Sequence, residues 1–377
     1  MKSRVFCTAT LAPSMNLAKL YAMNALPKLC AKAERPAVAV PQAPLVVGGI
    51  ALPNRVILAP MSGITDAPFR RLVSRLGAGL VVSEMTASEA LVAGRREARL
   101  RAEGEGVPIH VVQLAGCEPR WMAEGARIAE ANGAHIIDIN MGCPSRRVTT
   151  GYSGSALMRD LDHALALIEA TVAAVSVPVT LKMRLGWDER SVNAPALARR
   201  AESAGVQLIT VHGRTRCQFY DGKADWAAIR RVKRAVSIPL VANGDVTSFD
   251  DAVAALAQSG ADAIMIGRAA RGRPWFPGQV ARYLATRKRE PAPSLERQHH
   301  LIAELYDEML LHHGRKVALR HARKHLGWAL DVAAAGSGAP FDLVRSLRTR
   351  VLTADQPASV AQGLSEAYGA LAWRAAA

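Results

Sequence analysis

Residues 109–140 of this chain read IHVVQLAGCEPRWMAEGARIAEANGAHIIDIN. The run 109–115 is apolar and rich in β-branched residues, which is typical of a buried strand. The stretch 119–132 has the spacing of an amphipathic helix, and Gly133 stands where helices commonly end. A second apolar run, 135–140, follows directly. This order of strand, helix and strand predicts one unit of an α/β fold.

The same unit recurs along the chain from about residue 45. Eight strand–helix units over roughly 240 residues match the size of a (β/α)₈ barrel, and no G-x-G-x-x-G follows the first strand as a dinucleotide-binding sheet would need. We predict an α/β TIM barrel over residues 45–290 and a smaller all-helical domain over residues 291–377. The predicted strands are 56–61, 80–85, 109–115, 135–140, 178–183, 208–212, 239–243 and 263–266. The predicted helices are 66–76, 119–132, 160–175, 194–204, 226–236, 249–258 and 275–287.

The composition narrows the class of protein. The chain has 377 residues, of which 50% are hydrophobic and 21% charged, so collagen-like, coiled-coil and wholly disordered proteins are excluded. Lys and Arg total 48 against 32 Asp and Glu, which gives a formal net charge of +16. Such a charge favours a polyanionic partner such as nucleic acid. A solvated basic surface without a partner is the alternative.

Cysteine usage and the N-terminal region suggest an intracellular protein without a metal. The five cysteines are odd in number and contain no C-x-x-C pair, so we expect neither a disulfide framework nor a zinc site. Prolines interrupt the uncharged run 36–54, which argues against a membrane span. Residues 1–44 are basic and lack periodicity, and we expect a poorly ordered arm. The predicted location is cytoplasmic, and no protein partner is inferred.

Polar residues or glycines follow all eight predicted strands. In a barrel, active-site groups lie at the C-terminal ends of the strands, so these residues are expected to meet at one mouth. They are Met61, Ser62 and Gly63, then Glu84, Gln113, residues 140–144, Lys182 and Arg184, residues 212–214, residues 243–245, and Gly267 with Arg268.

Lys182 indicates a ligand, because a buried ammonium needs an anion or an electron-rich partner. A flavin fits, since its ring carbonyl and N1 region accept hydrogen bonds from residues such as Lys182 and Gln113. Gly244 and Gly267 would let backbone approach a phosphate, and Arg268 would add charge. The alternative is that these glycines only form turns.

Cys143 lies in a Gly-Cys-Pro turn just beyond the fourth predicted strand. A thiol held in a rigid loop at a barrel mouth can serve as an acid or as a nucleophile. Packing is the alternative for any small cysteine. His212 is expected at the mouth beside Lys182, although a core histidine remains an alternative. A protease-like Cys–His pair would not explain Lys182 or Gln113.

Five segments carry a resemblance to a known family: 59–70 (APMSGITDAPFR), 138–144 (DINMGCP), 182–184 (KMR), 211–215 (VHGRT) and 242–246 (ANGDV). Together they resemble the tRNA-dihydrouridine synthase family, and the similarity spans roughly residues 45–375. The run GYSGSALM, residues 151–158, is most similar to the bacterial B-type subgroup.

The resemblance implies an FMN-containing barrel that reduces the C5=C6 bond of selected uridines in tRNA with NADPH. It implies hydride transfer from FMN N5 to C6 and protonation of C5 by Cys143, on a base flipped out of the tRNA. Asn140 and Arg184 are candidates for binding the polar edge of the base. By motif matching, the residues that would hold FMN are Pro60, Met61, Ser62, Gln113, Lys182, His212, Asn243, Gly244, Asp245, Gly267 and Arg268.

The C-terminal region contains a basic run, RKVALRHARKH at residues 315–325, with five formal positive charges. On a helix, Lys316, Arg320, Arg323 and Lys324 fall close to one face. Beside a base-modifying site we expect Arg320, Arg323 and Lys324 to bind RNA phosphates. A solvated helix face is the alternative.

Two other functions remain open from the sequence. A flavin barrel that acts on a small anionic substrate, of the dihydroorotate or enoate type, would not need the basic helical domain. A non-catalytic RNA-binding module would not need Cys143 or Lys182.

Overall fold

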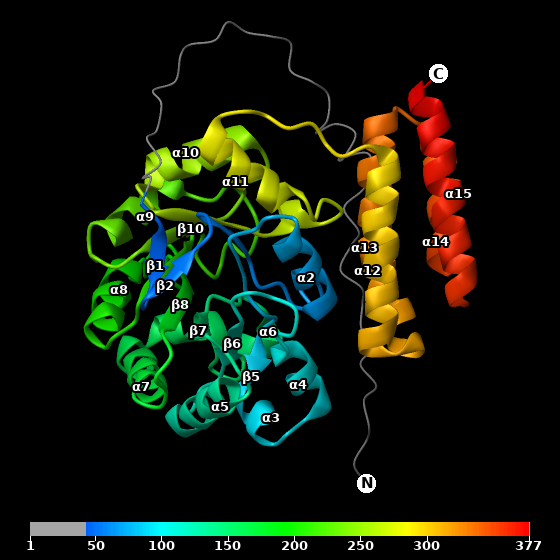
Figure 1. Ribbon diagram of the computed structural model, residues 1–377. Coiled ribbons are helices and arrows are strands. Elements are labelled where there is room, and N and C mark those ends of the chain that lie inside the picture. The colour runs from blue at the N-terminus through cyan, green and yellow to red at the C-terminus, as the bar shows by residue number, and fades with distance from the viewer. Residues whose placement is uncertain (1–42, 377) are drawn as a thin grey trace, which may run out of the picture.

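A computed structural model describes residues 43–376 of the chain. The predicted N-terminal arm, residues 1–44, therefore lies outside the described residues except for its last two. Figure 1 shows two parts side by side, a rounded α/β barrel and a set of long helices that ends at the C-terminus.

The barrel is built from one curled parallel sheet. Its strands are β3 (Val56–Leu58), β4 (Leu80–Val81), β5 (Thr86–Ala87), β6 (Val111–Ala115), β7 (Ile136–Met141), β8 (Val179–Arg184), β9 (Leu208–His212), β10 (Leu240–Asn243) and β11 (Ala263–Ile266). They pair in the order β4-β3-β11-β10-β9-β8-β7-β6-β5. Val82, just beyond β4, forms a parallel bridge with Val111 of β6, which brings the two ends of the sheet together. The predicted (β/α)₈ barrel is confirmed.

The second predicted strand, residues 80–85, is interrupted in the structure. After β4 the Ser83 hydroxyl donates to Glu84 O at 3.0 Å and accepts from Gln113 N at 2.9 Å. The Ser83 hydroxyl thus accepts the hydrogen bond from Gln113 N that a backbone carbonyl would accept in a regular parallel ladder. The chain resumes as β5, and Glu84 lies between the two short strands.

In strand β7, apolar side chains face the helices and polar side chains face the barrel interior. Ile137, Ile139 and Met141 pack in the layer between the sheet and its helices, and all are at most 1% exposed. Successive side chains in a strand point to opposite faces, so Asp138 and Asn140 point into the barrel. Register pairs Asp138 with Gln113 and Thr180, and Asn140 with Lys182. The sheet therefore stacks polar side chains inside the barrel.

Helices cover the outer surface of this sheet. They are α2 (Ala67–Arg75), α3 (Ser88–Val92), α4 (Arg96–Ala102), α5 (Pro119–Ala131), α7 (Leu161–Val172), α8 (Ala194–Ser203), α9 (Trp226–Lys233), α10 (Phe249–Ser259) and α11 (Phe276–Thr286). Side-chain caps fix several beginnings, as where Ser248 and Asp251 form a capping box on α10. All seven predicted helices exist. Six of them are shorter than predicted, and α10 extends one residue further. The helices α3, α4 and α6 (Arg146–Thr149) were not predicted.

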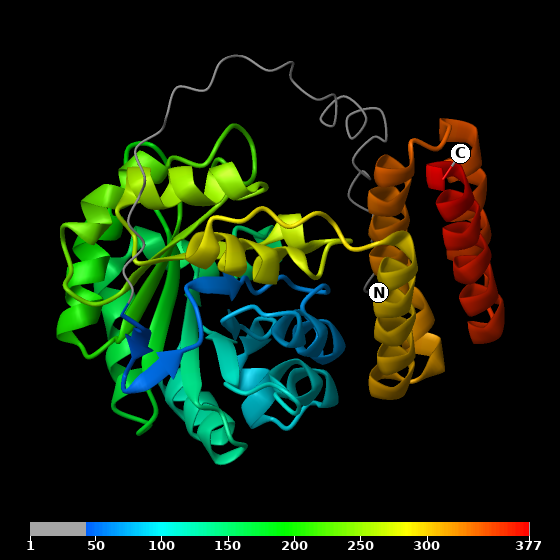
Figure 2. The same cartoon turned by 45° about the horizontal axis from the view of Figure 1, so that its top comes forward.

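A hairpin covers the N-terminal end of the barrel. It consists of β1 (Leu45–Val47) and β2 (Ile50–Leu52), and the sequence pattern did not predict it. Leu45, Val47 and Leu52 are at most 4% exposed and pack with residues of the barrel interior. Figure 2 shows the hairpin at one end of the strands, so it closes the barrel interior at that end.

The C-terminal region is helical, as predicted. It consists of α12 (Leu295–His313), α13 (Arg315–Ser337), α14 (Phe341–Thr353) and α15 (Pro357–Ala376). Ser294 caps α12, and the apolar faces of these helices share one core with residues from α2 of the barrel. No helix within residues 43–376 has the length and apolarity that crossing a membrane requires.

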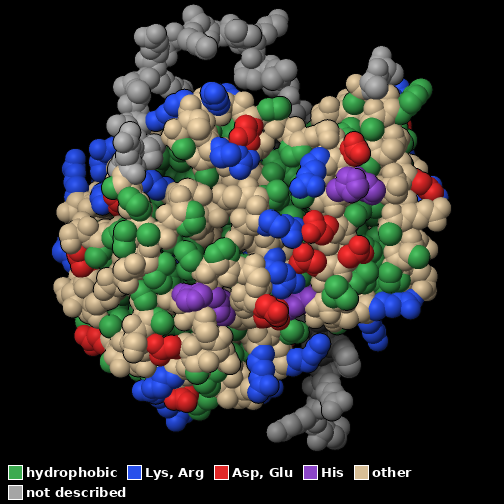
Figure 3. All heavy atoms as spheres, viewed as in Figure 1, with side chains coloured by type: hydrophobic (Ala, Val, Ile, Leu, Met, Phe, Trp, Pro, Cys, Tyr) green, Lys and Arg blue, Asp and Glu red, His purple; other side chains and the backbone are tan. Residues whose placement is uncertain are grey.

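The contact between barrel and helical region joins α2 to α12. Arg71 Nε lies 2.9 Å from Glu308 Oε2, and Arg75 Nη2 lies 2.7 Å from Glu304 Oε1. Acidic and basic side chains intermingle along this junction in Figure 3. Below the ion pairs, Phe69 of α2 belongs to the same buried cluster as α12. The two parts are therefore held by both apolar and charged contacts.

Candidate active site

The predicted site residues of the barrel lie at the C-terminal ends of its strands or in the loops that follow them. Pro60 to Ser62 follow β3, Gln113 lies in β6, Asn140 in β7, and Cys143 just beyond it. Lys182 and Arg184 lie in β8, and His212 ends β9. The others follow β10 and β11: Asn243, which ends β10, then Gly244, Asp245, Gly267 and Arg268.

A chain of hydrogen bonds runs from the barrel interior to the Cys143 loop. Asp138 Oδ1 accepts from Thr180 Oγ1 at 2.6 Å, and its Oδ2 accepts from Gln113 Nε2 at 2.7 Å. Gln113 Oε1 then accepts from Asn140 Nδ2 at 2.7 Å. Asn140 Oδ1 in turn accepts from Cys143 N at 2.9 Å and from Gly142 N at 3.1 Å. The loop that carries the thiol is thus tied to buried polar groups.

The Cys143 thiol is partly buried beside two cations. Burial raises its pKa above the ordinary value of 9.0, while the charges of Arg184 and Lys182 act in the opposite direction. The thiol is therefore protonated at neutral pH, as a proton donor must be. The other described cysteines, Cys117 and Cys217, are also free thiols.

Lys182 points into the barrel from β8, between Leu181 and Met183, which face the helices. Burial, and after it the charge of Arg184, lower its pKa to about 8, while Asp138 and Cys143 oppose the shift. Among residues 43–376, no hydrogen bond or ion pair to Nζ is present. An ammonium in this setting binds an acceptor from a ligand if one enters the mouth.

Arg184 holds two loops together. Its Nε donates to Gly142 O at 2.9 Å, and its Nη1 donates to Thr215 O at 2.7 Å and Phe219 O at 2.8 Å. Burial lowers its pKa to about 10. Two of the three guanidinium nitrogens of Arg184 thus donate to backbone carbonyl groups, and the bond to Gly142 O positions the Cys143 loop. Its predicted contact with the base stays a prediction.

His212 lies at the mouth and is neutral. Burial and the neighbouring cations Arg184, Lys182 and Arg214 hold its pKa well below 6.5. Arg214 Nη1 lies 3.3 Å from His212 Nε2, and a guanidinium can only donate, so the imidazole proton is on Nδ1. His212 is therefore an N–H donor on its other side.

Asp245 forms ion pairs with two arginines near the ends of β10 and β11. It accepts from Arg214 Nη2 at 2.5 Å and from Arg268 Nη2 at 3.0 Å. The preceding Gly244 has φ of +118°, and a Cβ there would lie 2.7 Å from Ala224 Cβ and 2.8 Å from His212 Cδ2. Only glycine fits this turn. At Gly267 an added Cβ would meet ordinary contacts, so that glycine is not required by space.

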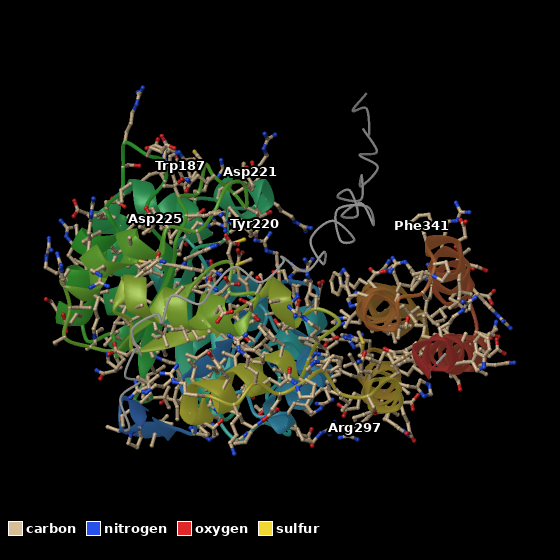
Figure 4. The ribbon with its side chains drawn as sticks, turned by 90° about the horizontal axis from the view of Figure 1, so that it is seen from above. Trp187, Tyr220, Asp221, Asp225, Arg297 and Phe341 are labelled. Carbon is tan, nitrogen blue, oxygen red and sulfur yellow. The ribbon has the colours of Figure 1, made fainter. Side chains whose placement is uncertain are left out.

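The mouth carries more cationic than anionic groups. Lys182, Arg184, Arg214 and Arg268 gather there, while Asp245 is the acid that pairs with two of them. Tyr220 covers this group, with its ring 4.8 Å from Arg268 Cζ and 5.5 Å from Arg184 Cζ. Figure 4 shows Tyr220 and Trp187 along the same edge of the barrel, away from the hairpin. This arrangement suits an anionic ligand with an electron-rich ring.

The loop after β3 connects the mouth to the helical region. Gly63 N donates to Glu84 Oε1, and burial raises the pKa of the Glu84 carboxyl. A Cβ placed on Gly63 would lie 3.0 Å from Lys324 Nζ of α13. Lys324 is therefore half-buried against the barrel, whereas Arg320 and Arg323 are exposed.

Several residues in or beneath this site were absent from the predicted set of binding residues. Asp138 binds the predicted Gln113, and Thr180, below the site, binds Asp138. Arg214, expected at the mouth but not as a binding residue, binds the predicted Asp245, and Tyr220 covers Arg184 and Arg268. Asp138 and Thr180 could have been found as polar positions inside otherwise apolar strands. Tyr220 lies in an irregular loop, so no periodic pattern in the sequence could indicate its position at the site.

Comparisons with known proteins show the family of this chain. The family model for dihydrouridine synthase matches residues 57–341, which is more than half of the chain. A probable tRNA-dihydrouridine synthase of Rhizobium leguminosarum bv. phaseoli is 55% identical over 326 residues, which cover 86% of this chain and 99% of that protein. The tRNA-dihydrouridine synthase B of Xanthomonas axonopodis pv. citri is 48% identical over 283 residues, or 75% of this chain and 85% of that protein.

Among solved structures, histamine dehydrogenase from Rhizobium sp. 4-9 is similar with a TM-score of 0.49 and 16% identity, over 70% of this chain and 50% of that one. That similarity is too distant to bear on function. The family model and the curated relatives confirm the resemblance read from the sequence. The chain thus belongs to the tRNA-dihydrouridine synthase family of oxidoreductases.

Proposed function

We propose that this protein reduces selected uridines in tRNA to 5,6-dihydrouridine, with FMN bound in the barrel mouth and NADPH as the reductant. The observation that carries the proposal is the position of Cys143, whose loop Asn140 and Arg184 hold at the mouth, while burial raises the pKa of its thiol. An enzyme that saturates a C=C bond by hydride transfer from a flavin also needs a group that donates a proton to the substrate. The Cys143 thiol is such a group.

The fit of FMN rests on the donors at the mouth. Lys182 Nζ, and the N–H groups left over on Gln113 and His212, suit the acceptor atoms of an isoalloxazine ring. Arg268 and the turn at Gly244 suit a phosphate. The other residues proposed to hold FMN are Pro60, Met61, Ser62, Asn243, Asp245 and Gly267.

The proposed chemistry divides between cofactor and protein. When bound, FMN would supply the hydride for C6 of the uracil, with NADPH as the source of that hydride. The Cys143 thiol donates its proton to C5, so the C5=C6 double bond becomes a single bond and the thiolate regains a proton from solvent. The Asn140 hydrogen bonds hold the Cys143 backbone, and Arg184 fixes Gly142 from below. Asn140 and Arg184 are also proposed to bind the polar edge of the base.

The proposed RNA partner explains the exposed charge of the helical region. A uracil inside a folded tRNA must leave its stack before it can reach Cys143. Arg320 and Arg323 are exposed on α13, and Lys324 of the same helix packs by the Gly63 loop at the mouth. We assign residues 291–377 as the tRNA-binding domain and residues 45–290 as the FMN-binding barrel.

Purified protein tests this proposal. The bound flavin should be released on denaturation and identified as FMN, and anaerobic NADPH should bleach its absorbance. Addition of unmodified tRNA should restore the absorbance and produce dihydrouridine. A small enoate or orotate that restores the absorbance in place of tRNA would favour the small-substrate oxidoreductase instead. A colourless protein that FMN cannot reconstitute would contradict both enzymes and favour a non-catalytic RNA-binding module.

A further inference from the structure

Asp138 lies in β7 two residues before Asn140, and both of its side-chain hydrogen bonds go to other side chains inside the barrel. It is 4% exposed, in the middle of β7, where it faces Gln113 of β6 and Thr180 of β8 across the sheet. A carboxylate so deep in a barrel is costly unless hydrogen bonds compensate its burial. Its two partners are the Thr180 hydroxyl and the Gln113 amide.

From these contacts we infer that Asp138 is a positioning residue that sets the orientation of the Gln113 and Asn140 amides, and through them the Cys143 loop. The inference deepens the proposed function and rests on it only for the role of Cys143 in uridine reduction.

The direction of these hydrogen bonds follows from which groups can donate and which can only accept. An ionised carboxylate only accepts, so Gln113 must present its NH₂ to Asp138. Its carbonyl oxygen then faces Asn140, whose NH₂ must turn toward Gln113. Asn140 Oδ1 is left to face the loop, where Gly142 N and Cys143 N need an acceptor. One buried acceptor therefore fixes two amides that could otherwise flip.

The orientation has a consequence for the mouth. The primary amides of Gln113 and Asn140 each have a second N–H beyond those used in the chain. Together with Lys182, they present donors to a ligand, which suits a ring whose edge consists of acceptors. If the amides flipped, carbonyl oxygens would replace these donors, and Asn140 would face the Cys143 and Gly142 N–H groups with its own NH₂.

The carboxylate form is required for this control. Burial raises the pKa of Asp138, while the hydrogen bonds from Thr180 and Gln113 and the charge of Lys182 lower it. Above that pKa Asp138 only accepts. Below it the protonated oxygen can donate, and the orientation of Gln113 is no longer imposed.

The test compares Asp138→Asn with Thr180→Val. The amide introduced by Asp138→Asn could donate to Gln113 and permit the flipped chain, whereas the Thr180 variant removes the other hydrogen bond of Asp138 but leaves its acceptor character. We expect Asp138→Asn to lower kcat for uridine reduction about tenfold or more, the size of one misplaced hydrogen bond. We also expect it to weaken FMN binding. Thr180→Val should keep kcat and FMN affinity within about twofold.

A second readout does not depend on uridine reduction. Iodoacetamide labelling of Cys143 at pH 8, followed by peptide mass spectrometry, reports on the loop. In Asp138→Asn the loosened loop should expose the thiol, lower its pKa and speed labelling several-fold. If labelling changes while no variant or wild type reduces uridine, the positioning role stands and the proposed function fails.

The double variant Asp138→Asn with Gln113→Glu separates positioning from general damage. The carboxylate that it introduces in β6 accepts both from the new amide in β7 and from Asn140, so the Asn140 amide is again held with Oδ1 toward Cys143. Labelling of Cys143 should return to the wild-type rate, while FMN binding stays weak because a carboxylate in place of the Gln113 amide has no N–H to donate. A structural defect alone would not be repaired by adding a second substitution.

The wild-type protein gives a test that no folding failure can obscure. Neutron diffraction on crystals grown in deuterated solvent locates amide deuterons directly. We expect deuterons on the Gln113 nitrogen facing Asp138 and on the Asn140 nitrogen facing Gln113. The reversed orientation, or wild-type kcat, FMN affinity and labelling in folded Asp138→Asn, would overturn the inference.

Discussion

Asn140 Nδ2 donates to Gln113 Oε1 over 2.7 Å, and this hydrogen bond joins two parts of the site that the sequence treats separately. Gln113 lies in β6 where a flavin ring is proposed, and Asn140 lies in β7 where it holds the backbone of Cys143. The proposed cofactor site and the proposed proton donor are therefore one connected polar unit.

Replacing Cys143 with Ala should remove the proton donor without disturbing the flavin. We expect FMN content and flavin reduction by NADPH to match the wild type, while dihydrouridine formation falls by about 10²–10⁴-fold, the usual contribution of general acid catalysis. Stopped-flow reoxidation of the reduced flavin by tRNA measures the step. Cys217→Ala, at an exposed free thiol, is the matched control. Equal rates in wild type and Cys143→Ala would remove Cys143 from the mechanism.

FMN affinity should depend on the charge of Lys182. Its pKa in the free protein is lowered to about 8 by burial, and an electron-rich ligand favours the ammonium form. Affinity should therefore be constant below pH 8 and weaken above it, by up to about tenfold per pH unit until the pKa of the complex is reached. Quenching of FMN fluorescence between pH 6 and 10 measures this. The same pH dependence in Lys182→Met would assign the effect to another group.

Exposed arginines of α13 should bind tRNA through charge. Arg320→Glu with Arg323→Glu should weaken tRNA binding and flatten the plot of log affinity against log salt by about 1.5 units, because each phosphate contact contributes somewhat under one unit. FMN content should not change. The control pair Arg345→Glu with Arg374→Glu makes the same charge change on the exposed surface of α14 and α15. Equal slopes for the two pairs would assign the α13 charges to a solvated helix face.

His325 should make the fold less stable in mild acid. It is 2% exposed beside Phe69, with ring centroids 5.0 Å apart, and burial lowers its pKa to about 4. The unfolded chain protonates this histidine near pH 6.5 and the folded chain does not. Its contribution to stability is therefore intact above pH 6.5 and declines toward pH 4, by up to about 1.4 kcal/mol per pH unit.

Thermal unfolding between pH 4.5 and 7.5 checks this expectation. His325→Phe should flatten the dependence of Tm on pH, while His300→Phe, at an exposed position of α12, should leave it unchanged. An unaltered pH dependence in His325→Phe would show that the other histidines at the junction with the barrel are responsible. His313, which lies 2.8 Å from Asp66 Oδ2, is the first of these to replace.

Periodicity is enough to predict the barrel and most of its strand ends, although β3 ends at Leu58 and β4 at Val81, earlier than predicted. The eight apolar runs, each followed by a polar group, place Lys182 and His212 at one mouth before any coordinates are known. Local pattern could not predict the β1–β2 hairpin, because its three-residue strands form only against the closed barrel.

Contacts between distant segments were beyond prediction. Arg184 reads as a substrate ligand in sequence, yet its nitrogens donate to carbonyls of two loops 31 to 42 residues away. Lys324 reads as one of several exposed cations, yet it packs by Gly63 of the barrel. Both roles depend on how the loops and the helical region are placed, which no periodicity encodes.

The most direct test of the central claim is mass spectrometry of tRNA from cells that lack this gene, complemented with wild type or Cys143→Ala. We predict that specific uridines in the deletion strain lack the two added hydrogens of dihydrouridine, and that wild type restores them at the same positions while Cys143→Ala does not. Unchanged dihydrouridine at every position in the deletion strain, together with no dihydrouridine formed by purified protein and NADPH on that tRNA stripped of the modification, would contradict the claim.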